Sequence, residues 1–374
     1  MRIALVVTGL QLGGAETQVA DLTRGFLSRG HDVTLISLTG DCAIRLPDDA
    51  RFRLIELRAA KSPVSLMRAL WRLAGHLRRI RPDVVHSHMV HANLMTRLAR
   101  LLTPLPALIC SAHSRNEGGR HWMLAYRLTD RLADVTTNVS DDAVAAFVAA
   151  HAAPARRIVA MPNGIDTGRF RPDDGARQRL RATLGVTDVT PVALATGRLV
   201  PAKDYPTLLR AFARVRGARP AARLFIAGAG TLHDTLDAQI DTLGLRAAVT
   251  LLGRRDDIPG LLCAADVFVM SSAWEGLPLV IGEAMAAGLP IASTDCGGVR
   301  ELVGETASAG LVPIGDDAAL AGAIEAGLAL DRQARAQIAS ANRARIDAHY
   351  SLEAIVARWL ACYDRVLQRH PPAP

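Results

Sequence analysis

Short apolar runs alternate with helical patterns along most of the chain. Runs of three to five residues rich in Val, Ile, Leu and Ala are bounded by turn residues at Ile3–Val7, Val33–Ser37, Val84–Ser87, Ala107–Cys110, Val135–Val139, Ile158–Met161, Val192–Ala195, Leu224–Ala227, Val249–Leu252, Val267–Met270 and Ile291–Ser293. Helical patterns lie between most of them, at Thr17–Arg29, Pro63–Arg79, Pro206–Arg216, Leu232–Leu243 and Leu279–Ala287. Strands that are apolar throughout and alternate with helices are typical of parallel sheets covered on both faces. The pattern therefore predicts an α/β chain with doubly wound parallel sheets.

This pattern breaks once, near Gly164–Thr190, where turn residues are frequent and apolar residues are few. The chain of 374 residues also exceeds the roughly 250–300 residues at which one core stops growing. We therefore expect two domains, at residues 1–168 and 191–350, joined by a linker at residues 169–190.

Basic residues are concentrated in the first half of the chain. Residues 1–180 hold 25 Lys+Arg and 16 Asp+Glu, a net +9, whereas residues 181–374 hold 19 and 20, a net −1. Such asymmetry indicates a membrane surface, a nucleic acid or a phosphorylated ligand as partner, although a general drift toward arginine produces it too. Aromatic residues make up only 4% of the chain, so the stacking side chains of a nucleic-acid binder are scarce and we expect no nucleic-acid partner.

The cysteines and the longest apolar runs indicate in which cell compartment the protein lies. The five cysteines are scattered and contain no C-x-x-C pair, which argues against a disulfide framework or a zinc site. No apolar run reaches the ~18–20 residues that span a bilayer. We expect a cytoplasmic protein.

The segment Pro63–Arg81 is both amphipathic and basic. Its apolar side carries Leu66, Met67, Leu70, Leu73, Leu77 and Ile80, and its other sides carry Arg68, Arg72, His76, Arg78 and Arg79. Two interpretations stay open: the segment lies on an anionic bilayer, or it is a crossover helix that packs on its sheet and leaves its basic side in water.

Two loops after predicted strands are suited to a diphosphate. Gly13 and Gly14 follow the first strand and open a helix, where backbone N–H groups approach an anion; a plain tight turn explains them equally well. Arg198 and Lys203 follow Val192–Ala195, at the edge where α/β sheets bind ligands, as a bidentate fork and a point charge. The alternative is a solvated loop.

A third loop follows Val267–Met270 and carries two carboxylates. Glu275 lies in the loop itself, and Pro278 is suited to the first turn of the helix that contains Glu283. Carboxylates accept from vicinal sugar hydroxyls, although Glu283 can also cap or pair locally.

Histidines gather after two strands of the first half. His113 follows Ala107–Cys110 and either faces a ligand or is a bystander. His86, His88 and His91 are spaced like metal ligands, but no carboxylate accompanies them, so we expect no metal site.

Taken together, these motifs resemble the nucleotide-sugar-dependent glycosyltransferases of family 4. The resemblance covers nearly the whole chain, at Gly13–Glu16, Pro162–Asp166, Gly197–Lys203, Gly228–Gly230, Glu275–Glu283 and Gly297–Glu301. It implies a GT-B fold, in which two Rossmann-like domains face a central cleft, with an acceptor-side domain first and a donor-binding domain second. It also implies a final helix, at residues 351–370, that crosses back to the first domain.

The resemblance also assigns roles to individual residues. Arg198 and Lys203 would neutralise the diphosphate, Glu275 would contact hydroxyls of the transferred sugar, Glu283 would bind the ribose, and Arg254 lies in the loop that would meet the base. The predicted catalytic residues are His113, Arg198, Lys203 and Glu275. The predicted donor-binding residues are Gly13, Gly14, Arg198, Lys203, Gly228, Arg254, Gly276, Leu277, Pro278, Leu279 and Glu283.

The activity implied is transfer of a hexosyl or N-acetylhexosaminyl group, with retention, from a nucleotide sugar, with UDP-sugars the commonest donors. The acceptor would be a hydroxyl of a glycan or lipid-linked saccharide in polysaccharide or lipopolysaccharide synthesis, without metal or cofactor. A basic first domain fits peripheral binding to the cytoplasmic membrane face.

Two other enzyme classes remain as alternatives. A nucleotide-sugar epimerase would use the same donor grip. A dinucleotide oxidoreductase finds support in Gly228 and Gly230, but His233 stands where the third glycine of G-x-G-x-x-G belongs.

Overall fold

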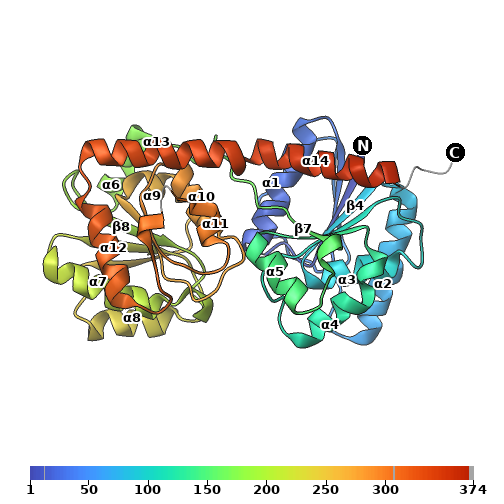
Figure 1. Cartoon of the computed structure of the whole chain (residues 1–374), viewed down its shortest axis with the longest axis horizontal. Helices are drawn as coiled ribbons and strands as arrows, with labels where there is room; N and C mark the ends of the chain where they lie inside the picture. The colour runs from blue at the N-terminus through green and yellow to red at the C-terminus, as the bar shows by residue number, and fades with distance from the viewer. Residues whose placement is uncertain (12, 306–307, 370–374) are drawn as a thin grey trace. The chain divides into compact units, whose positions relative to one another are not determined.

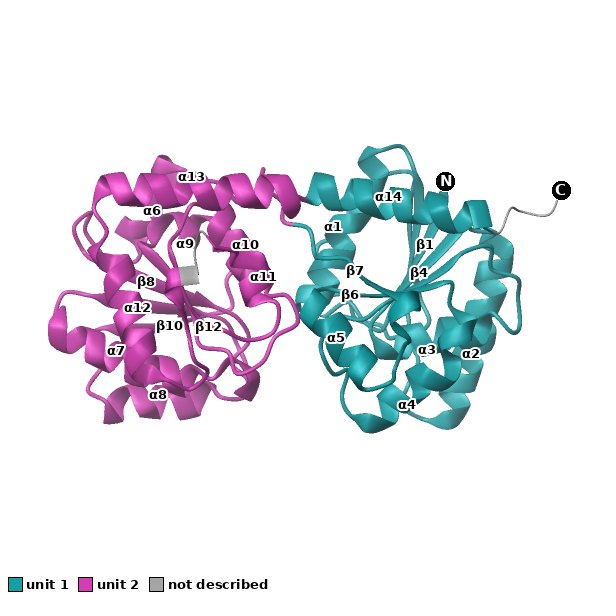
Figure 2. Ribbon diagram, in the orientation of Figure 1, with its two compact units in different colours: residues 1–164, 352–374 teal, residues 165–351 magenta. Residues whose placement is uncertain are grey.

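The computed structural model describes residues 1–11, 13–305 and 308–369. The chain forms two compact units, residues 1–164 with 352–374 (unit 1) and Ile165–Ser351 (unit 2), which are described separately below (Figure 2). The sequence placed the first boundary at residue 168, four residues later than the structure does. His370, at the end of the expected final helix, lies outside the described residues.

Unit 1 is built on a seven-stranded, all-parallel sheet of order β3-β2-β1-β4-β5-β6-β7. Its strands are β1 (Arg2–Val7), β2 (Asp32–Ser37), β3 (Phe52–Glu56), β4 (Val84–His88), β5 (Leu108–Ser111), β6 (Val135–Asn138) and β7 (Ile158–Ala160). Its α-helices are α1 (Gly14–Ser28), α2 (Pro63–Ile80), α3 (Val90–Ala99), α4 (Arg120–Thr129), α5 (Asp141–Ala149) and α14 (Leu352–Arg369).

Alternate residues of the central strand, β1, point to opposite faces of this sheet. Ile3, Leu5 and Val7 pack against α1 and α14, whereas Ala4 and Val6 pack against α2 and α3 (Figure 1). Because both sides of β1 are covered, every position from Ile3 to Val7 is buried, which explains the unbroken apolar run in the sequence.

The C-terminal helix α14 is part of the unit 1 core. Ile355, Val356 and Trp359 are buried among residues of β1 and α1. Tyr363 is fully buried as well, and its hydroxyl is 2.6 Å from Nδ1 of His86 on β4. The first unit is therefore completed by a segment that follows unit 2 in the sequence.

Unit 2 is built on a six-stranded, all-parallel sheet of order β10-β9-β8-β11-β12-β13. Its strands are β8 (Val192–Thr196), β9 (Arg223–Ala227), β10 (Val249–Gly253), β11 (Val267–Met270), β12 (Ile291–Thr294) and β13 (Leu311–Val312). Its α-helices are α6 (Asp174–Thr183), α7 (Tyr205–Ala218), α8 (His233–Thr242), α9 (Ile258–Ala264), α10 (Leu279–Ala286), α11 (Val299–Val303), α12 (Asp317–Ala329) and α13 (Arg332–His349).

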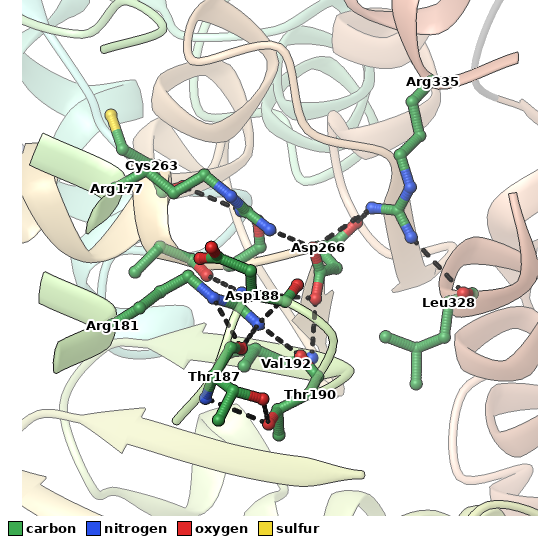
Figure 3. A network of polar contacts seen from close by, with 12 residues as sticks. Arg177, Arg181, Thr187, Asp188, Thr190, Val192, Cys263, Asp266, Leu328 and Arg335 are labelled. Carbon is green, nitrogen blue, oxygen red and sulfur yellow. Dashed lines mark hydrogen bonds and ion pairs between the residues drawn. The ribbon is translucent and has the colours of Figure 1, made fainter. Parts of the chain in front are cut away.

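The segment expected as a linker, residues 169–190, is instead part of unit 2 and contains α6. Figure 3 shows how Asp266 holds it: Asp266 accepts from Arg177 at 2.7 Å and from the backbone N–H of Val192 at 2.8 Å. Arg181, only 1% exposed, donates to the Ala264 carbonyl at 2.7 Å and lies 3.5 Å from Asp266. Because α6 is held by ion pairs and hydrogen bonds, it lacks the apolar pattern that would have predicted it.

Helix α2 packs on its sheet, as the crossover-helix interpretation of the amphipathic segment expects. It begins with Ser62, whose hydroxyl accepts from the Ser65 backbone N–H, and with Pro63 at the first helical position. Leu73 and Leu77 are buried against the sheet, as expected of a crossover helix, whereas Met67 is 57% exposed. Among the described helices, none is long and apolar enough to cross a membrane.

Candidate active site

The loops that follow β8 and β9 lie against each other, backbone to backbone. The Gly197 N–H donates to the Ala227 carbonyl at 3.0 Å, and the Leu199 N–H donates to the Ala229 carbonyl at 2.9 Å. A Cβ atom on Gly228 would lie 1.8 Å from the Gly197 oxygen, far closer than non-bonded atoms can approach. Gly228, predicted from the sequence to bind the donor, therefore has a structural role, because it lets the loop that carries Arg198 and Lys203 pack on its neighbour.

Lys203 and Glu275 meet at the carboxyl edge of the unit 2 sheet. Their strands, β8 and β11, are neighbours, and Lys203 Nζ donates to Glu275 Oε1 at 2.5 Å. The two side chains are 18% and 15% exposed. Ser272 Oγ donates to the same carboxylate oxygen at 2.7 Å, and Ser271 Oγ donates to the Lys203 carbonyl at 2.8 Å. An ammonium has three N–H donors, so the lysine keeps two for an anion at this edge.

The loop after β12 supports the Glu275 loop from the other side. Gly297 has φ +55°, and a Cβ atom there would lie 2.2 Å from the Glu275 carbonyl oxygen. The Gly298 N–H donates to the Gly276 carbonyl at 2.7 Å. The Glu275 loop is thus held through the Glu275 side chain and through the Gly276 carbonyl.

Helix α10 begins directly after this loop. Gly276, Leu277 and Pro278 are buried and lead into the helix, whose first residue is Leu279 and which contains the partly exposed Glu283. The first N–H groups of a helix have no partner within it and carry positive potential. The start of α10 therefore lies only a few residues after Glu275, on the same loop that carries the carboxylate of the Lys203–Glu275 pair.

The two predicted arginines of unit 2 are more exposed. Arg198 shares the β8 loop with Lys203, and within the described residues its side chain has no ion-pair partner. Arg254, in the loop after β10, lies 3.7 Å from Asp256 with 54% of its side chain exposed. Thr196, at the end of β8, has a buried hydroxyl without a hydrogen-bond partner in the described structure.

The three predicted site residues of unit 1 lie at the carboxyl ends of its strands. Gly13 precedes the first residue of α1, Gly14, and its carbonyl accepts from the Thr17 N–H at 3.0 Å. His113 follows β5, and its Nε2 is 3.1 Å from Nδ1 of His88, the last residue of β4. The structure therefore brings His113 to a residue that the sequence raised only as a metal-ligand candidate.

Burial keeps these histidines neutral. It lowers the pKa of His86 and His88 well below the usual value and lowers the pKa of His113 to about 4. A neutral imidazole has one donor and one acceptor nitrogen. The His88–His113 bond uses one of each, so His88 Nε2 and His113 Nδ1 are left as one donor and one acceptor.

Both of these nitrogens are buried without a partner among the described residues, as is Nε2 of Gln18. All three side chains line one small cavity, together with Asn163 and with Trp359 of α14. A donor and an acceptor in one cavity are suited to a hydroxyl group, which can both accept and donate. No group of three or more His, Cys, Asp or Glu side chains arranged to hold a metal occurs in the described part of the chain.

Comparison with known proteins identifies the family. The family model "Glycosyltransferase Family 4" matches residues 12–169, and the model "Glycosyl transferases group 1" matches residues 176–345. A GDP-mannose-dependent alpha-(1-6)-phosphatidylinositol monomannoside mannosyltransferase of Mycobacterium tuberculosis is 31% identical over 263 residues, 67% of this chain and 68% of that protein. The chain belongs to the glycosyltransferases of family 4.

A second sequence relative and a solved structure are also similar to this glycosyltransferase. A GDP-mannose-dependent monoacylated alpha-(1-6)-phosphatidylinositol monomannoside mannosyltransferase of Corynebacterium glutamicum is 34% identical over 221 residues, which cover 56% of this chain and 56% of that protein. The solved structure of HepE from Anabaena in complex with UDP covers 98% of this chain and 100% of its own, with a TM-score of 0.83 and 23% identity.

The glycosyltransferase has the α/β GT-B fold, with a Rossmann-like parallel sheet in each unit. Because the chain belongs to a glycosyltransferase family, the alternative that it is a dinucleotide oxidoreductase is wrong. Four residues of the candidate site could not be predicted from the sequence, because serine, glutamine and glutamate in loops and helix starts follow no pattern of their own: Ser271, Ser272, Gln18 and Glu117.

Glu117 supports the His113 loop of the glycosyltransferase. Its carboxyl group accepts from the His113 backbone N–H at 2.8 Å, and the Tyr126 hydroxyl lies 3.2 Å away. Burial raises the pKa of Glu117 to about 7. The loop that places His113 thus depends on a carboxyl group that titrates near neutral pH.

We predict that Glu117→Gln changes how stability depends on pH. Between pH 4.5 and about 7 the folded protein keeps a proton on Glu117 that the unfolded chain has released, so rising pH lowers the free energy of unfolding across this window. The buried histidines have lowered pKa values and act in the opposite sense below pH 6.5, so the measured quantity is the difference between variant and wild type.

This difference, taken from denaturant unfolding, should shift in favour of Glu117→Gln by up to ~1.4 kcal/mol per pH unit across the window. Glu353→Gln, at a carboxylate whose side chain is 90% exposed, is the control and should give a flat difference. A flat difference for Glu117→Gln as well would contradict the prediction.

Proposed function

We propose that the protein transfers a hexosyl or N-acetylhexosaminyl group from a nucleoside-diphosphate sugar to a hydroxyl of a glycan or lipid-linked saccharide. The observation that carries this proposal is the pairing of Lys203 with Glu275 at the carboxyl edge of the unit 2 sheet. This pair combines a cation suited to a phosphate with a carboxylate suited to sugar hydroxyls. Phosphate and sugar are the two parts of such a donor that take part in the reaction.

Glycosyl transfer from such a donor requires that the departing diphosphate be stabilised. When the bond from the anomeric carbon to the diphosphate breaks, negative charge grows on the phosphate oxygens. The ammonium of Lys203, the guanidinium of Arg198 and the N–H groups at the start of α10 are positively polarised groups on neighbouring loops. Fixed groups of this kind stabilise the transition state with little reorganisation.

We propose that transfer proceeds with retention, through attack from the face that the diphosphate leaves, with a diphosphate oxygen taking the proton of the acceptor hydroxyl. The two unpartnered imidazole nitrogens in the unit 1 cavity support binding of a sugar hydroxyl by His113 Nδ1 and His88 Nε2. The names of two relatives, which act on phosphatidylinositol monomannosides, support a lipid-linked acceptor and a place in glycolipid or polysaccharide synthesis.

Two donors compete, and each has support. A UDP-sugar is the donor that the sequence led us to expect, and the HepE structure that covers this chain holds UDP. GDP-mannose is the second candidate, because the relatives from Corynebacterium and Mycobacterium are GDP-mannose-dependent. In either case we propose that Glu283 binds the ribose and that Arg254 lies near the base.

We predict that Lys203→Ala lowers kcat by ~10²–10³, by analogy with the loss of one preorganised donor. The chain offers a matched control, because Lys61 is its only other lysine and is exposed in unit 1. With a water-soluble acceptor, Lys61→Ala should keep the wild-type rate. Thermal melting of both variants separates lost chemistry from lost folding, and a Lys203→Ala enzyme of full rate would refute the role of this lysine.

We predict that Glu283→Ala weakens binding of the nucleoside diphosphate of the true donor, UDP or GDP, by ~10–100-fold. This loss corresponds to the free energy of about 1.5–3 kcal/mol that hydrogen bonds to a charged group contribute. Calorimetric titration with UDP, GDP and inorganic pyrophosphate should show this loss for the nucleotide and not for pyrophosphate, which has no ribose. Glu325→Ala on α12 removes a carboxylate of the same type elsewhere in unit 2 and is the control. Equal loss for nucleotide and pyrophosphate would argue against the ribose role.

We predict that transfer continues at its full rate in excess EDTA. Arg198 and Lys203 would supply the positive charge that a divalent cation supplies elsewhere. Rates measured before and after EDTA, and again after added Mg²⁺ or Mn²⁺, check this. A rate that falls with EDTA and returns with the metal would overturn the metal-free mechanism.

A further inference from the structure

The exposed apolar side chains of the protein are concentrated on one part of unit 1. Among the described residues, twelve large apolar side chains are exposed, and eight of them lie on α2, on α4, or on α3 and the residues that directly follow it. Helix α3 contacts both α2 and α4, so the three helices lie side by side on one face of the sheet (Figure 1). We call their solvent side the α2–α4 face.

Helix α2 is apolar on two opposite sides. The side that carries Leu73 and Leu77 is buried in the core, as described above. Val64, Met67 and Trp71 recur at spacings of three and four residues, so they share the other side, where they are 69%, 57% and 59% exposed. The solvent-facing set therefore overlaps only in part with the apolar side that the sequence pattern predicted: it includes Met67 but adds Val64 and Trp71.

Arginines continue this outer side of α2. Arg68 lies within the turn formed by Val64, Met67 and Trp71, and Arg78 and Arg79 follow two turns later; all three are exposed. Arg68 and Arg79 have no ion-pair partner within the described structure. The outer side of α2 thus presents apolar side chains in its first half and cations throughout.

Helices α3 and α4 repeat this composition. On α4, Leu124 and Leu128 are 53% and 76% exposed, one helical turn apart, and exposed Arg127 lies between them. Leu98 on α3 and Leu101 just beyond its end are 42% and 66% exposed. The mixture of exposed apolar and basic side chains therefore extends across all three helices.

The charge of unit 1 is carried by the same segment of the chain. Unit 1 has 24 Lys+Arg and 15 Asp+Glu, a net +9, and residues 61–131 alone have 12 and 3, also a net +9. The remainder of unit 1 is balanced at 12 and 12. The basic excess seen in the sequence is thus a local property of the segment that forms the α2–α4 face.

We propose that the α2–α4 face docks on the surface of an anionic lipid bilayer, whichever donor the enzyme uses. Arginines meet lipid phosphates while their stems lie along apolar surface, and apolar side chains enter the boundary between headgroups and acyl chains. Trp71 is a residue type that prefers this boundary, with an apolar ring and a polar N–H. A nucleic acid would need several aromatic stacking platforms, and Trp71 is the large aromatic side chain that this face exposes.

Vesicle flotation of the full chain tests the proposal. Wild-type protein should float with vesicles of phosphatidylcholine mixed with phosphatidylglycerol and stay behind with vesicles of phosphatidylcholine alone. Added salt should weaken the binding, because it screens the arginine contribution. Wild-type protein that binds neither vesicle, or binds both equally, would overturn the proposal.

Two double variants test the two components separately. Arg68→Gln with Arg79→Gln should lower vesicle partitioning by roughly fivefold per arginine, about 25-fold together. Met67→Ser with Trp71→Ser should also lower it, and should do so at high salt as well. All four side chains are exposed, so thermal melting should show wild-type folding.

The matched controls lie in unit 2. Arg179→Gln with Arg332→Gln removes the same charge from exposed positions, and Val189→Ser with Ile314→Ser removes exposed apolar surface; both should bind as wild type does. Test variants that bind like wild type would overturn the proposal. So would sedimentation velocity that shows a wild-type dimer lost on Met67→Ser with Trp71→Ser while vesicle binding is unchanged, because the face would then be occupied by a second copy of the chain.

Discussion

The close approach of loop backbones at the carboxyl edge of the unit 2 sheet is the constraint on which the candidate site depends. The loop after β8 can reach its neighbour only because Gly228 has no side chain, and the loop after β11 is supported in the same way by Gly297. Together these contacts place Lys203 and Glu275 at 2.5 Å from each other. Binding groups of opposite charge are thus positioned by glycines that need not touch a ligand.

Much of the fold could be predicted from the sequence, because interior parallel strands are apolar at every position. Strands β3 and β13 were not predicted. Both are edge strands, and β3 is only partly buried, with Arg53 interrupting its apolar residues and Glu56 at its end. Helix α6 was taken for a linker because its buried contacts are made by arginines, and apolar periodicity cannot detect those.

The candidate site was predictable to the extent that sheet topology decides it. Lys203 and Glu275 follow two strands, and parallel strands end at the same edge, so their proximity follows once β8 and β11 are neighbours. The roles of Gln18 and His88 could not be predicted, because the cavity that they line is completed by residues distant in the sequence, such as Asn163 and Trp359. Ser272 is only three residues from its partner Glu275, but a single loop serine follows no pattern that marks it. The donor–acceptor pair in the unit 1 cavity exists only because burial keeps both histidines neutral.

Unit 1 is formed by segments that precede and follow unit 2 in the sequence, which affects the order in which the two units can fold during synthesis. His86 is buried on β4, but its hydroxyl partner on Tyr363 lies 277 residues further along. While the ribosome is still adding unit 2, the core of unit 1 lacks α14, so this imidazole nitrogen has no phenol to bond and the apolar side of the sheet is uncovered. Unit 2, a continuous stretch, can complete its core earlier, so domains that usually fold in order of synthesis would here finish in reverse.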